Sequence, residues 1–229
     1  MEDRDRAYYR YLQTSEVGQD TARAHREIIA GYFWNILDNH GCRDVLDVGC
    51  GLGFFLGKAS RGVNAVGVDS NLNVVEHCRR DGRKIILGSG AELPLRDGVM
   101  DGIHCAHLLE HLPDPERAFM EYHRVLRDGG VLVVRVPPFD ASFYDDWSHV
   151  RPFTKKSLLR LAAVAGYRHA RVFYYHYDLP FRKWDASAFR LLNRGRHLPI
   201  IRQAIDGLIK LYGLPPKELV LVARKATRR

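Results

Sequence analysis

Short apolar runs alternate along this chain with longer stretches in which apolar residues return every third or fourth position. The runs predict strands over residues 44–49, 64–68, 84–88, 101–106, 130–136, 169–177 and 219–225. The helical spacing predicts helices over residues 19–40, 53–60, 72–81 and 114–126. Because strands and helices alternate, we expect an α/β fold with a mostly parallel sheet and helices on both faces.

The last two predicted strands are separated by an insertion, residues 178–218, in place of a crossover of ordinary size. Within it, apolar residues from Pro199 to Tyr212 form one stripe of a helix that Gly213 would end. Such a helix can cap a face of the core, lie on a membrane surface or form a dimer contact, and the sequence leaves these alternatives open. Before the insertion, Thr154 is expected to cap a further helix.

Length and composition predict a single domain. With 229 residues, of which 46% are hydrophobic and 27% charged, the chain has the size of one α/β domain with additions. It has no apolar run long enough for a transmembrane helix, and its first residues do not read as a secretory signal. The cysteines lie far apart, which predicts neither a zinc motif nor a disulfide framework and favours a reduced, cytoplasmic setting. They are Cys42, Cys50, Cys78 and Cys105.

The positive charge is concentrated at the end of the chain. Residues 182–229 carry a formal charge of +9, whereas the remaining residues carry −1. This segment is either a solvated basic tail or the contact for an anionic partner. Membrane phospholipid, a pyrophosphate-linked substrate and nucleic acid are the partners that such a charge favours.

A glycine turn follows the first predicted strand. The apolar run over 45–48 ends in Gly49, Gly51 and Gly53, and residues without a Cβ allow the backbone to approach a nucleotide-like ligand closely. A dinucleotide-binding pattern would place its third glycine at Phe54. An acid after the next strand, Asp69, stands where ribose hydroxyls are bound.

These segments resemble those of class I S-adenosylmethionine-dependent methyltransferases. The likeness rests on Val45–Gly53, Val66–Asp69, Gly90–Pro94 and the stretch from Asp101 to Val134. It implies a Rossmann-like, doubly wound sheet of seven strands with an antiparallel last strand. It also divides the single domain, residues 1–229, into an N-terminal helix (19–40), a cofactor-binding core (43–137) and a substrate-side half (138–229) with the helical insertion.

The resemblance implies a set of residues that hold S-adenosylmethionine, whose product is S-adenosylhomocysteine. Backbone atoms of the glycine turn approach the methionine part, Asp47 lies near its amino group, and Asp69 bridges the ribose hydroxyls. The full set is Asp47, Gly49, Cys50, Gly51, Gly53, Asp69, Ser70, Asn71, Ala91, Glu92 and His107. One departure concerns Gly90, because the family usually has an acid there that contacts the adenine amino group.

Three histidines, His104, His107 and His111, lie within eight residues. No zinc motif matches them, and the strand-to-helix change should point His104 away from the others, so we expect no metal. In the resembled family, His107 lies over the methionine end of the cofactor and His111 faces the pocket. Alternatively, His111 only caps the following turn.

The loop after the fifth strand mixes aromatic and polar residues at the edge where α/β sheets bind ligands. His149 is the candidate general base, with His111 as the second, because a neutral imidazole accepts a proton near pH 7. Tyr144 and Arg151 are candidate acceptor-binding residues. His149 and Arg151 can instead brace the loop. Asp145 and Asp146 have the chemistry of divalent-ion ligands, but the sequence shows no third ligand beside them.

The expected function is O-methylation of a small-molecule acceptor, a sugar or glycan hydroxyl. The segment His149–Thr154 is similar to methyltransferases of bacterial surface-glycan pathways, and this agrees with a basic insertion that could bring the protein to the inner membrane face. A lipidic quinone-like acceptor and a non-catalytic cofactor-binding subunit are the alternatives. Nucleic-acid methylation is disfavoured because the Asn-Pro-Pro-Tyr signature is absent. The sequence does not indicate the oligomeric state.

Overall fold

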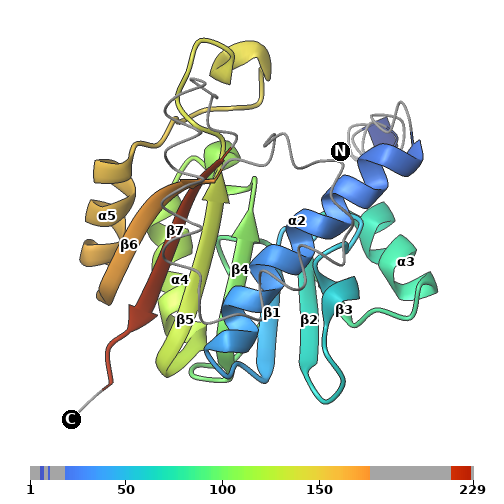
Figure 1. Cartoon of the computed structure of the whole chain (residues 1–229), viewed down its shortest axis with the longest axis horizontal. Helices are drawn as coiled ribbons and strands as arrows, with labels where there is room; N and C mark the ends of the chain where they lie inside the picture. Colours follow the sequence, from blue (N-terminus) through green and yellow to red (C-terminus); the bar gives the residue numbers. More distant parts are fainter. Residues whose placement is uncertain (1–5, 8–9, 11–18, 176–217, 228–229) are drawn as a thin grey trace, which may run out of the picture.

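The computed structural model describes residues 6–7, 10, 19–175 and 218–227. A sheet of seven strands runs through it in the order β3-β2-β1-β4-β5-β7-β6 (Figure 1). The strands are β1 (Asp44–Val48), β2 (Asn64–Asp69), β3 (Ile85–Leu87), β4 (Met100–Ala106), β5 (Leu126–Val136), β6 (Tyr167–Tyr175) and β7 (Glu218–Lys225). The first five are parallel, and β7 lies antiparallel between β5 and β6. The predicted α/β class, the doubly wound order and the antiparallel last strand are therefore confirmed.

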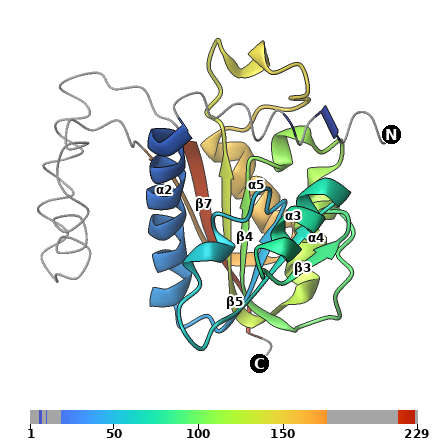
Figure 2. The ribbon, with the colours of Figure 1, turned by 90° about the vertical axis from the view of Figure 1, so that its right-hand side faces the viewer.

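Helices cover both faces of this sheet (Figure 2). The helix α2 (Gln19–Asn39) packs on one face, and α4 (Pro115–Val125) and α5 (Lys155–Val164) pack on the other. Side chains of β5 alternate between the two layers: Val131 and Val133 join the α2 side, whereas Leu132 and Val134 join the α4 side. A smaller cluster holds α3 (Leu72–Arg80) beside β3.

Polar side chains fix the first turns of three helices. Asn71 accepts hydrogen bonds from the amides at the start of α3, and Asp114 does the same for α4. Thr154 and Ser157 form a reciprocal capping box at α5, as the sequence predicts for Thr154. These caps set where the loops at the carboxyl edge of the sheet end.

One predicted helix is wrong. Over residues 53–60 the chain forms only the 3-10 turn η1 (Leu56–Lys58). Gly53 has a left-handed φ of 71° and Gly57 follows four residues later, and glycine at these positions disfavours a continuous α-helix. The predicted insertion over 178–218, including its helix, lies outside the described residues. Among the residues described, no helix is both long and apolar enough to cross a membrane.

Candidate functional site

The glycine turn lies at the carboxyl end of β1, where the strand order reverses between β1 and β4. Gly49, Gly51 and Gly53 all have left-handed backbones, with φ of 68°, 50° and 71°. A Cβ built on Gly51 would meet no atom within 4 Å, so this part of the turn faces open space. The turn therefore leaves room for a ligand to approach its backbone, as a cofactor of the predicted type requires.

Asp69, at the end of β2, is tied to this turn. Its carboxylate accepts hydrogen bonds from the amide of Gly51 at 3.0 Å and from that of Asn71 at 2.9 Å. Burial raises the pKa of Asp69, although these amides act in the opposite direction. The first two parallel strands thus bring the turn and the acid together, as their spacing in the sequence predicts.

Asp47 lies in the buried part of β1, two residues before the glycine turn. It is only 3% exposed, and its carboxylate contacts Nδ1 of His104 at 2.7 Å. Burial lowers the pKa of His104 despite this neighbour, which favours a neutral ring that donates its Nδ1 proton to Asp47. His104 stacks on Phe55 with the ring centroids 3.9 Å apart. Within the described residues, the Asp47 carboxylate thus contacts the buried ring of His104. Its role at the cofactor's amino group remains a prediction.

Gly90, where the resembled family usually has an acid, has little space for a side chain. A Cβ on Gly90 would lie 2.6 Å from Cδ2 of Leu108 and 3.1 Å from Cγ1 of Val48. A Cβ on Gly49 would also meet Leu108, at 3.2 Å. The Leu108 side chain therefore fills the volume between the two strand tips, which explains the absence of the acid in steric terms.

This packing gives a double-mutant prediction. Gly90→Asp should lower the free energy of unfolding by about 1 kcal/mol or more, because Leu108 must move to admit the new side chain. The loss should be smaller when the same change is made in a Leu108→Ala background, as urea unfolding of the four proteins would measure. Equal losses in both backgrounds would contradict the steric explanation.

The other predicted cofactor residues lie around the same edge. Ser70 is exposed, Asn71 is buried as the cap of α3, and Cys50 is buried behind the turn. Glu92 is exposed and pairs with Arg117 at 2.8 Å. Near it, the amide of Ala91 donates to Ser89 at 3.1 Å.

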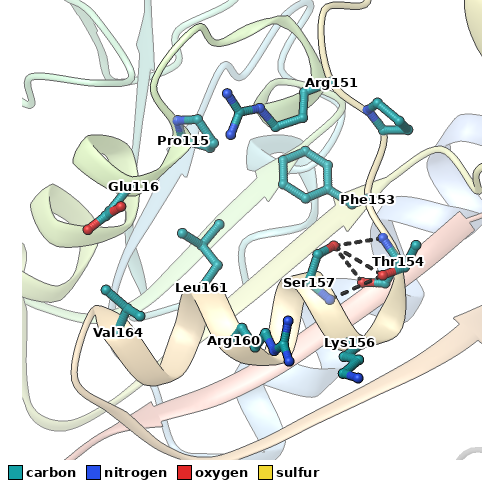
Figure 3. Close-up of a pocket in the computed structure, with 11 residues that line it drawn as sticks. Pro115, Glu116, Arg151, Phe153, Thr154, Lys156, Ser157, Arg160, Leu161 and Val164 are labelled. Atoms are coloured by element: carbon teal, nitrogen blue, oxygen red, sulfur yellow. Dashed lines mark hydrogen bonds between the residues drawn. The ribbon is translucent and has the colours of Figure 1, made fainter.

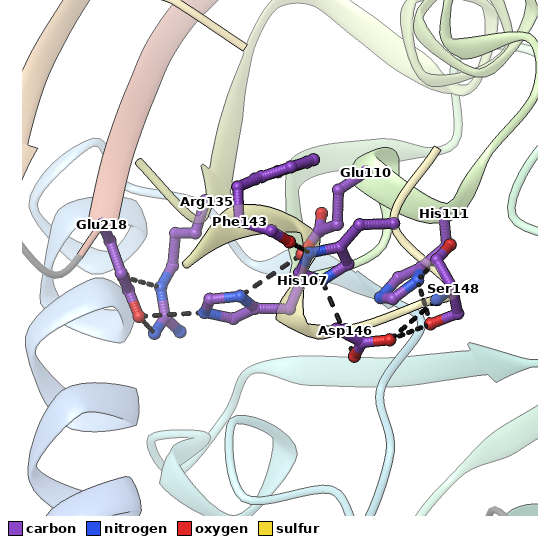
Figure 4. A network of polar contacts seen from close by, with 9 residues as sticks. His107, Glu110, His111, Arg135, Phe143, Asp146, Ser148 and Glu218 are labelled. Carbon is purple, nitrogen blue, oxygen red and sulfur yellow. Dashed lines mark hydrogen bonds and ion pairs between the residues drawn. The ribbon is translucent and has the colours of Figure 1, made fainter. Parts of the chain in front are cut away.

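His107 follows β4 and lies between two carboxylates (Figure 4). Its Nε2 lies 3.1 Å from Glu218 and its Nδ1 lies 3.4 Å from Glu110. Although partial desolvation acts to lower it, the two carboxylates raise the pKa of His107 to about 9, and 46% of its side chain is still exposed. The backbone of His107 is left-handed, with φ of 50°, which is uncommon for a residue with a side chain.

One of the two carboxylates beside His107, that of Glu218, also forms a buried ion pair with Arg135. Arg135 of β5 donates to both carboxylate oxygens of Glu218, with Nε at 2.7 Å from Oε2. The guanidinium also lies over the ring of Phe33 on α2, 4.2 Å from its centroid. Burial would raise the pKa of Glu218, but the positive charges of Arg135 and His107 outweigh this effect and lower the pKa to about 2.

The two candidate bases, His111 and His149, lie side by side although they are far apart in the sequence. Their ring centroids are 4.9 Å apart. His111 is the last residue of the 3-10 turn η2 (Leu109–His111), and His149 follows η3 (Phe143–Asp145) in the loop after β5. Main-chain contacts dock this loop, because the amides of Val150 and Arg151 donate to the carbonyl of Glu110 at 2.8 and 3.3 Å.

Each of these rings is oriented by a carbonyl. Nδ1 of His149 lies 2.6 Å from the carbonyl of Phe143, and Nδ1 of His111 lies 3.3 Å from that of Ser148. A carbonyl only accepts, so both rings carry a proton on Nδ1, and each ring in its neutral form has its lone pair on Nε2. The bracing role that the sequence allows for His149 is thus present, and it leaves Nε2 available for chemistry.

The predicted acceptor residues flank this pair. Tyr144 is 60% exposed, and Arg151 is exposed with one contact to the carbonyl of Pro113 at 3.4 Å. Arg151 also lines an open pocket of about 370 Å³ between the start of α4 and α5 (Figure 3). Phe153 and Leu161 supply apolar wall, whereas Lys156 and Arg160 add positive charge.

Sequence reasoning missed the buried charged residues. Arg135, Glu110 and Glu218 are each at most 8% exposed. A detectable signal existed for Arg135, because a charge interrupts the run of valines over 131–136. No comparable signal marks Glu110, whose carbonyl holds a loop about forty residues further along the chain.

The comparisons with known proteins agree with this geometry. Residues 46–134 match the family model described as a methyltransferase domain. The matched residues contain the glycine turn, Asp69 and His111, and this part of the chain is similar to a methyltransferase domain. A solved S-adenosylmethionine-dependent methyltransferase of Archaeoglobus fulgidus is similar in fold, with a TM-score of 0.65, 21% identity and coverage of 87% of this chain and 94% of its own.

Curated relatives match this chain over part of their length. An uncharacterized 37.1 kDa protein from a transposon of Streptomyces fradiae is 32% identical over 65% of this chain and 49% of its own. A probable S-adenosylmethionine-dependent methyltransferase of Mycolicibacterium smegmatis is 37% identical over 43% of this chain and 40% of its own. A ubiquinone biosynthesis O-methyltransferase of Methylococcus capsulatus is 32% identical over 39% of this chain and 41% of its own. The match therefore spans about half or less of each relative.

Proposed function

We propose that this protein transfers a methyl group from S-adenosylmethionine to a hydroxyl of a small-molecule acceptor, specifically of a sugar or glycan. The observation that carries the proposal is the juxtaposition at one sheet edge. The glycine turn and Asp69 are joined there by the Gly51 hydrogen bond, and the loop with His149 docks on Glu110 at the same edge. Donor and acceptor would thus be held beside one another.

Positioning is the main contribution of the chain to such a transfer. When bound, S-adenosylmethionine supplies an electrophilic methyl on a sulfonium, which an oxygen nucleophile attacks in line. Holding both reactants in register accounts for roughly 7–11 kcal/mol of barrier in favourable cases. Backbone atoms of Gly49 and Gly51 would hold the donor, Asp69 would bind the ribose hydroxyls, and Ser70 and Asn71 would lie beside the adenine.

We assign His149 as the base that takes the proton of the attacking hydroxyl, and His111 as the second candidate for this base. Nδ1 of His149 donates to the Phe143 carbonyl, so that the ring presents the lone pair of Nε2. The hydroxyl proton would pass to Nε2 as the oxygen–methyl bond forms and the carbon–sulfur bond breaks.

Cationic side chains in the pocket between α4 and α5 would bind a charged group on the acceptor, and neither His149 nor His111 lines that pocket. Arg151, two residues from His149, lines the pocket with Lys156 and Arg160. Phosphate or pyrophosphate esters of sugars carry the matching charge. This complementarity supports the glycan proposal, and a peripheral membrane location through residues 182–229 would serve the same substrates when they are lipid-linked.

A quinone-like acceptor is the second candidate. It is supported by the ubiquinone biosynthesis O-methyltransferase among the relatives, which shares part of this domain. Such an acceptor would use the apolar wall of the pocket, Phe153 and Leu161, more than its cations. A non-catalytic cofactor-binding subunit would bind the donor without consuming it.

A screen for consumption of S-adenosylmethionine separates these candidates. The protein is incubated with nucleotide sugars, glycans, quinone precursors and RNA in parallel, and S-adenosylhomocysteine is quantified. We expect turnover with the sugar-containing acceptors. Turnover only with quinone precursors would establish the second candidate, and cofactor binding without turnover on any acceptor would favour the subunit.

The assigned base gives a direct prediction for the acceptor that the screen identifies. His149→Ala should lower turnover by about 100-fold, a typical share for general-base catalysis, while affinity for S-adenosylmethionine stays unchanged. Steady-state rates at saturating acceptor provide the measurement. His77→Ala, in the last turn of α3, serves as the matched control, and near-normal turnover of His149→Ala would reject the assignment.

A further inference from the structure

A group of potential metal ligands lies beside the proposed acceptor site. One ligand atom each from Glu110, His111 and His149 lies within 4.8 Å of the other two. The sequence drew attention to a different set, His104, His107 and His111. Of these, His104 is buried against Asp47 and His107 lies between two glutamates. The second histidine of the cluster, His149, comes from the docked loop.

The carboxylate of Glu110 is the most informative member. The side chain is fully buried, and neither of its oxygens has a hydrogen-bond partner within the described part of the chain. Its charged neighbour is Nδ1 of His107, at 3.4 Å. A buried carboxylate is costly unless hydrogen bonds or a cation compensate it, and one contact at this distance leaves most of its acceptor capacity unused.

The two imidazoles are held as metal-bound histidines usually are. Histidine ligands donate their second ring N–H to a carbonyl or carboxylate, which fixes the tautomer and aims the other nitrogen at the ion. Here the carbonyl of Phe143 holds His149 and that of Ser148 holds His111 (Figure 4). Ser148 also donates to Asp146 at 2.6 Å, so its hydroxyl is fixed as an acceptor for His111.

We propose that Glu110, His111 and His149 bind a divalent transition-metal ion of the zinc class. Two imidazoles and one carboxylate suit such ions, and three protein ligands leave a coordination position open. His111 and His149 are only half-buried, so water or an acceptor hydroxyl can reach that position. A further carboxylate lies close to the loop ligand, since Oδ2 of Asp146 is 3.8 Å from Nε2 of His149.

The catalytic role of this ion rests on the proposed function, whereas the metal site itself rests on geometry alone. A coordinated hydroxyl loses its proton more readily than a free one, so an ion here would take over the activation assigned above to Nε2 of His149. The proton would then pass to water. Metal binding itself requires neither cofactor nor acceptor, and it can be tested alone.

The experiment is a calorimetric titration of the full-length, chelator-treated protein with Zn²⁺, without cofactor or acceptor. We expect one ion per chain, with affinity about 100-fold weaker in Glu110→Gln and in His149→Gln. His77→Gln, which removes an imidazole on α3, should bind like the wild type. Co²⁺ added to the wild-type protein should give a visible ligand-field absorption that His149→Gln lacks.

Thermal unfolding keeps the result interpretable if a variant folds poorly. Zn²⁺ should raise the melting temperature of the wild type and of His77→Gln, and it should not raise that of Glu110→Gln or His149→Gln. A wild type that binds no stoichiometric Zn²⁺, or equal binding by the His77 and His149 variants, overturns the proposal. Since no methyl transfer is measured, a failure here is distinct from a failure of the proposed function.

Discussion

Asp69→Ala is expected to abolish measurable binding of S-adenosylmethionine in a calorimetric titration. The carboxylate would lose its hydrogen bonds to the ribose hydroxyls and also the contacts that tie it to the amides of Gly51 and Asn71. Each hydrogen bond to a charged group contributes about 1.5–3 kcal/mol, so loss of the ribose contacts alone implies roughly a 100-fold weaker affinity or more. The effect therefore combines a missing ligand contact with a loosened turn.

A matched variant separates this effect from general damage. Asp81→Ala removes an exposed carboxylate just after α3, close in sequence but outside the glycine turn, and it should bind like the wild type. Circular dichroism of both variants would establish that the sheet is intact. Unaltered affinity in Asp69→Ala would refute the ribose contact and, with it, the main support for the cofactor assignment.

Glu218→Gln is expected to lower the free energy of unfolding by about 3–5 kcal/mol, the range seen when one partner of a buried ion pair is removed. Arg135 would remain buried without a counter-charge, and His107 would lose its contact to Glu218. Urea unfolding at pH 7 provides the measurement. In contrast, Arg135→Met combined with Glu218→Met should be much less destabilised than Glu218→Gln, because no unpaired charge is then left buried.

The same carboxylate predicts an acid dependence of stability. The pKa of Glu218 is depressed from 4.5 to about 2 by Arg135 and His107, against the effect of burial. A depressed carboxyl pKa contributes stability above the unfolded-state value, and this contribution is lost as the pH falls toward the folded-state value. The wild type should therefore lose about 3 kcal/mol between pH 4.5 and pH 2 through this group. Glu218→Gln should lack that part of the slope, and identical slopes would contradict the assignment.

The sequence predicted those features that depend on local pattern. The glycine turn, Asp69 at the second strand tip and the cap at Thr154 each follow from a few neighbouring residues. The doubly wound, mostly parallel sheet followed as well, because apolar runs alternate with helical spacing and the motifs resemble a family of known topology. The failure over residues 53–60 has a local cause, since the glycines there outweigh the apolar spacing.

The features that the sequence did not reveal depend on contacts between distant segments. The loop near Val150 docks on the carbonyl of the buried Glu110, and that loop brings His149 to His111. Likewise, Arg135 and Glu218 meet through the antiparallel pairing of β5 and β7. Leu108 could not be placed between Gly49 and Gly90 from any periodicity. Such pairings require the tertiary structure.

The docking of the acceptor loop has a consequence for how substrate preference can diversify. The amides of Val150 and Arg151 hold the loop through the single carbonyl of Glu110, and these main-chain bonds are largely indifferent to side-chain identity. Substitutions at exposed loop positions such as Tyr144 can therefore accumulate without disturbing the alignment of donor and acceptor. The side chains of the loop, and with them the preferred acceptor, can therefore change while the main-chain attachment to Glu110 stays the same.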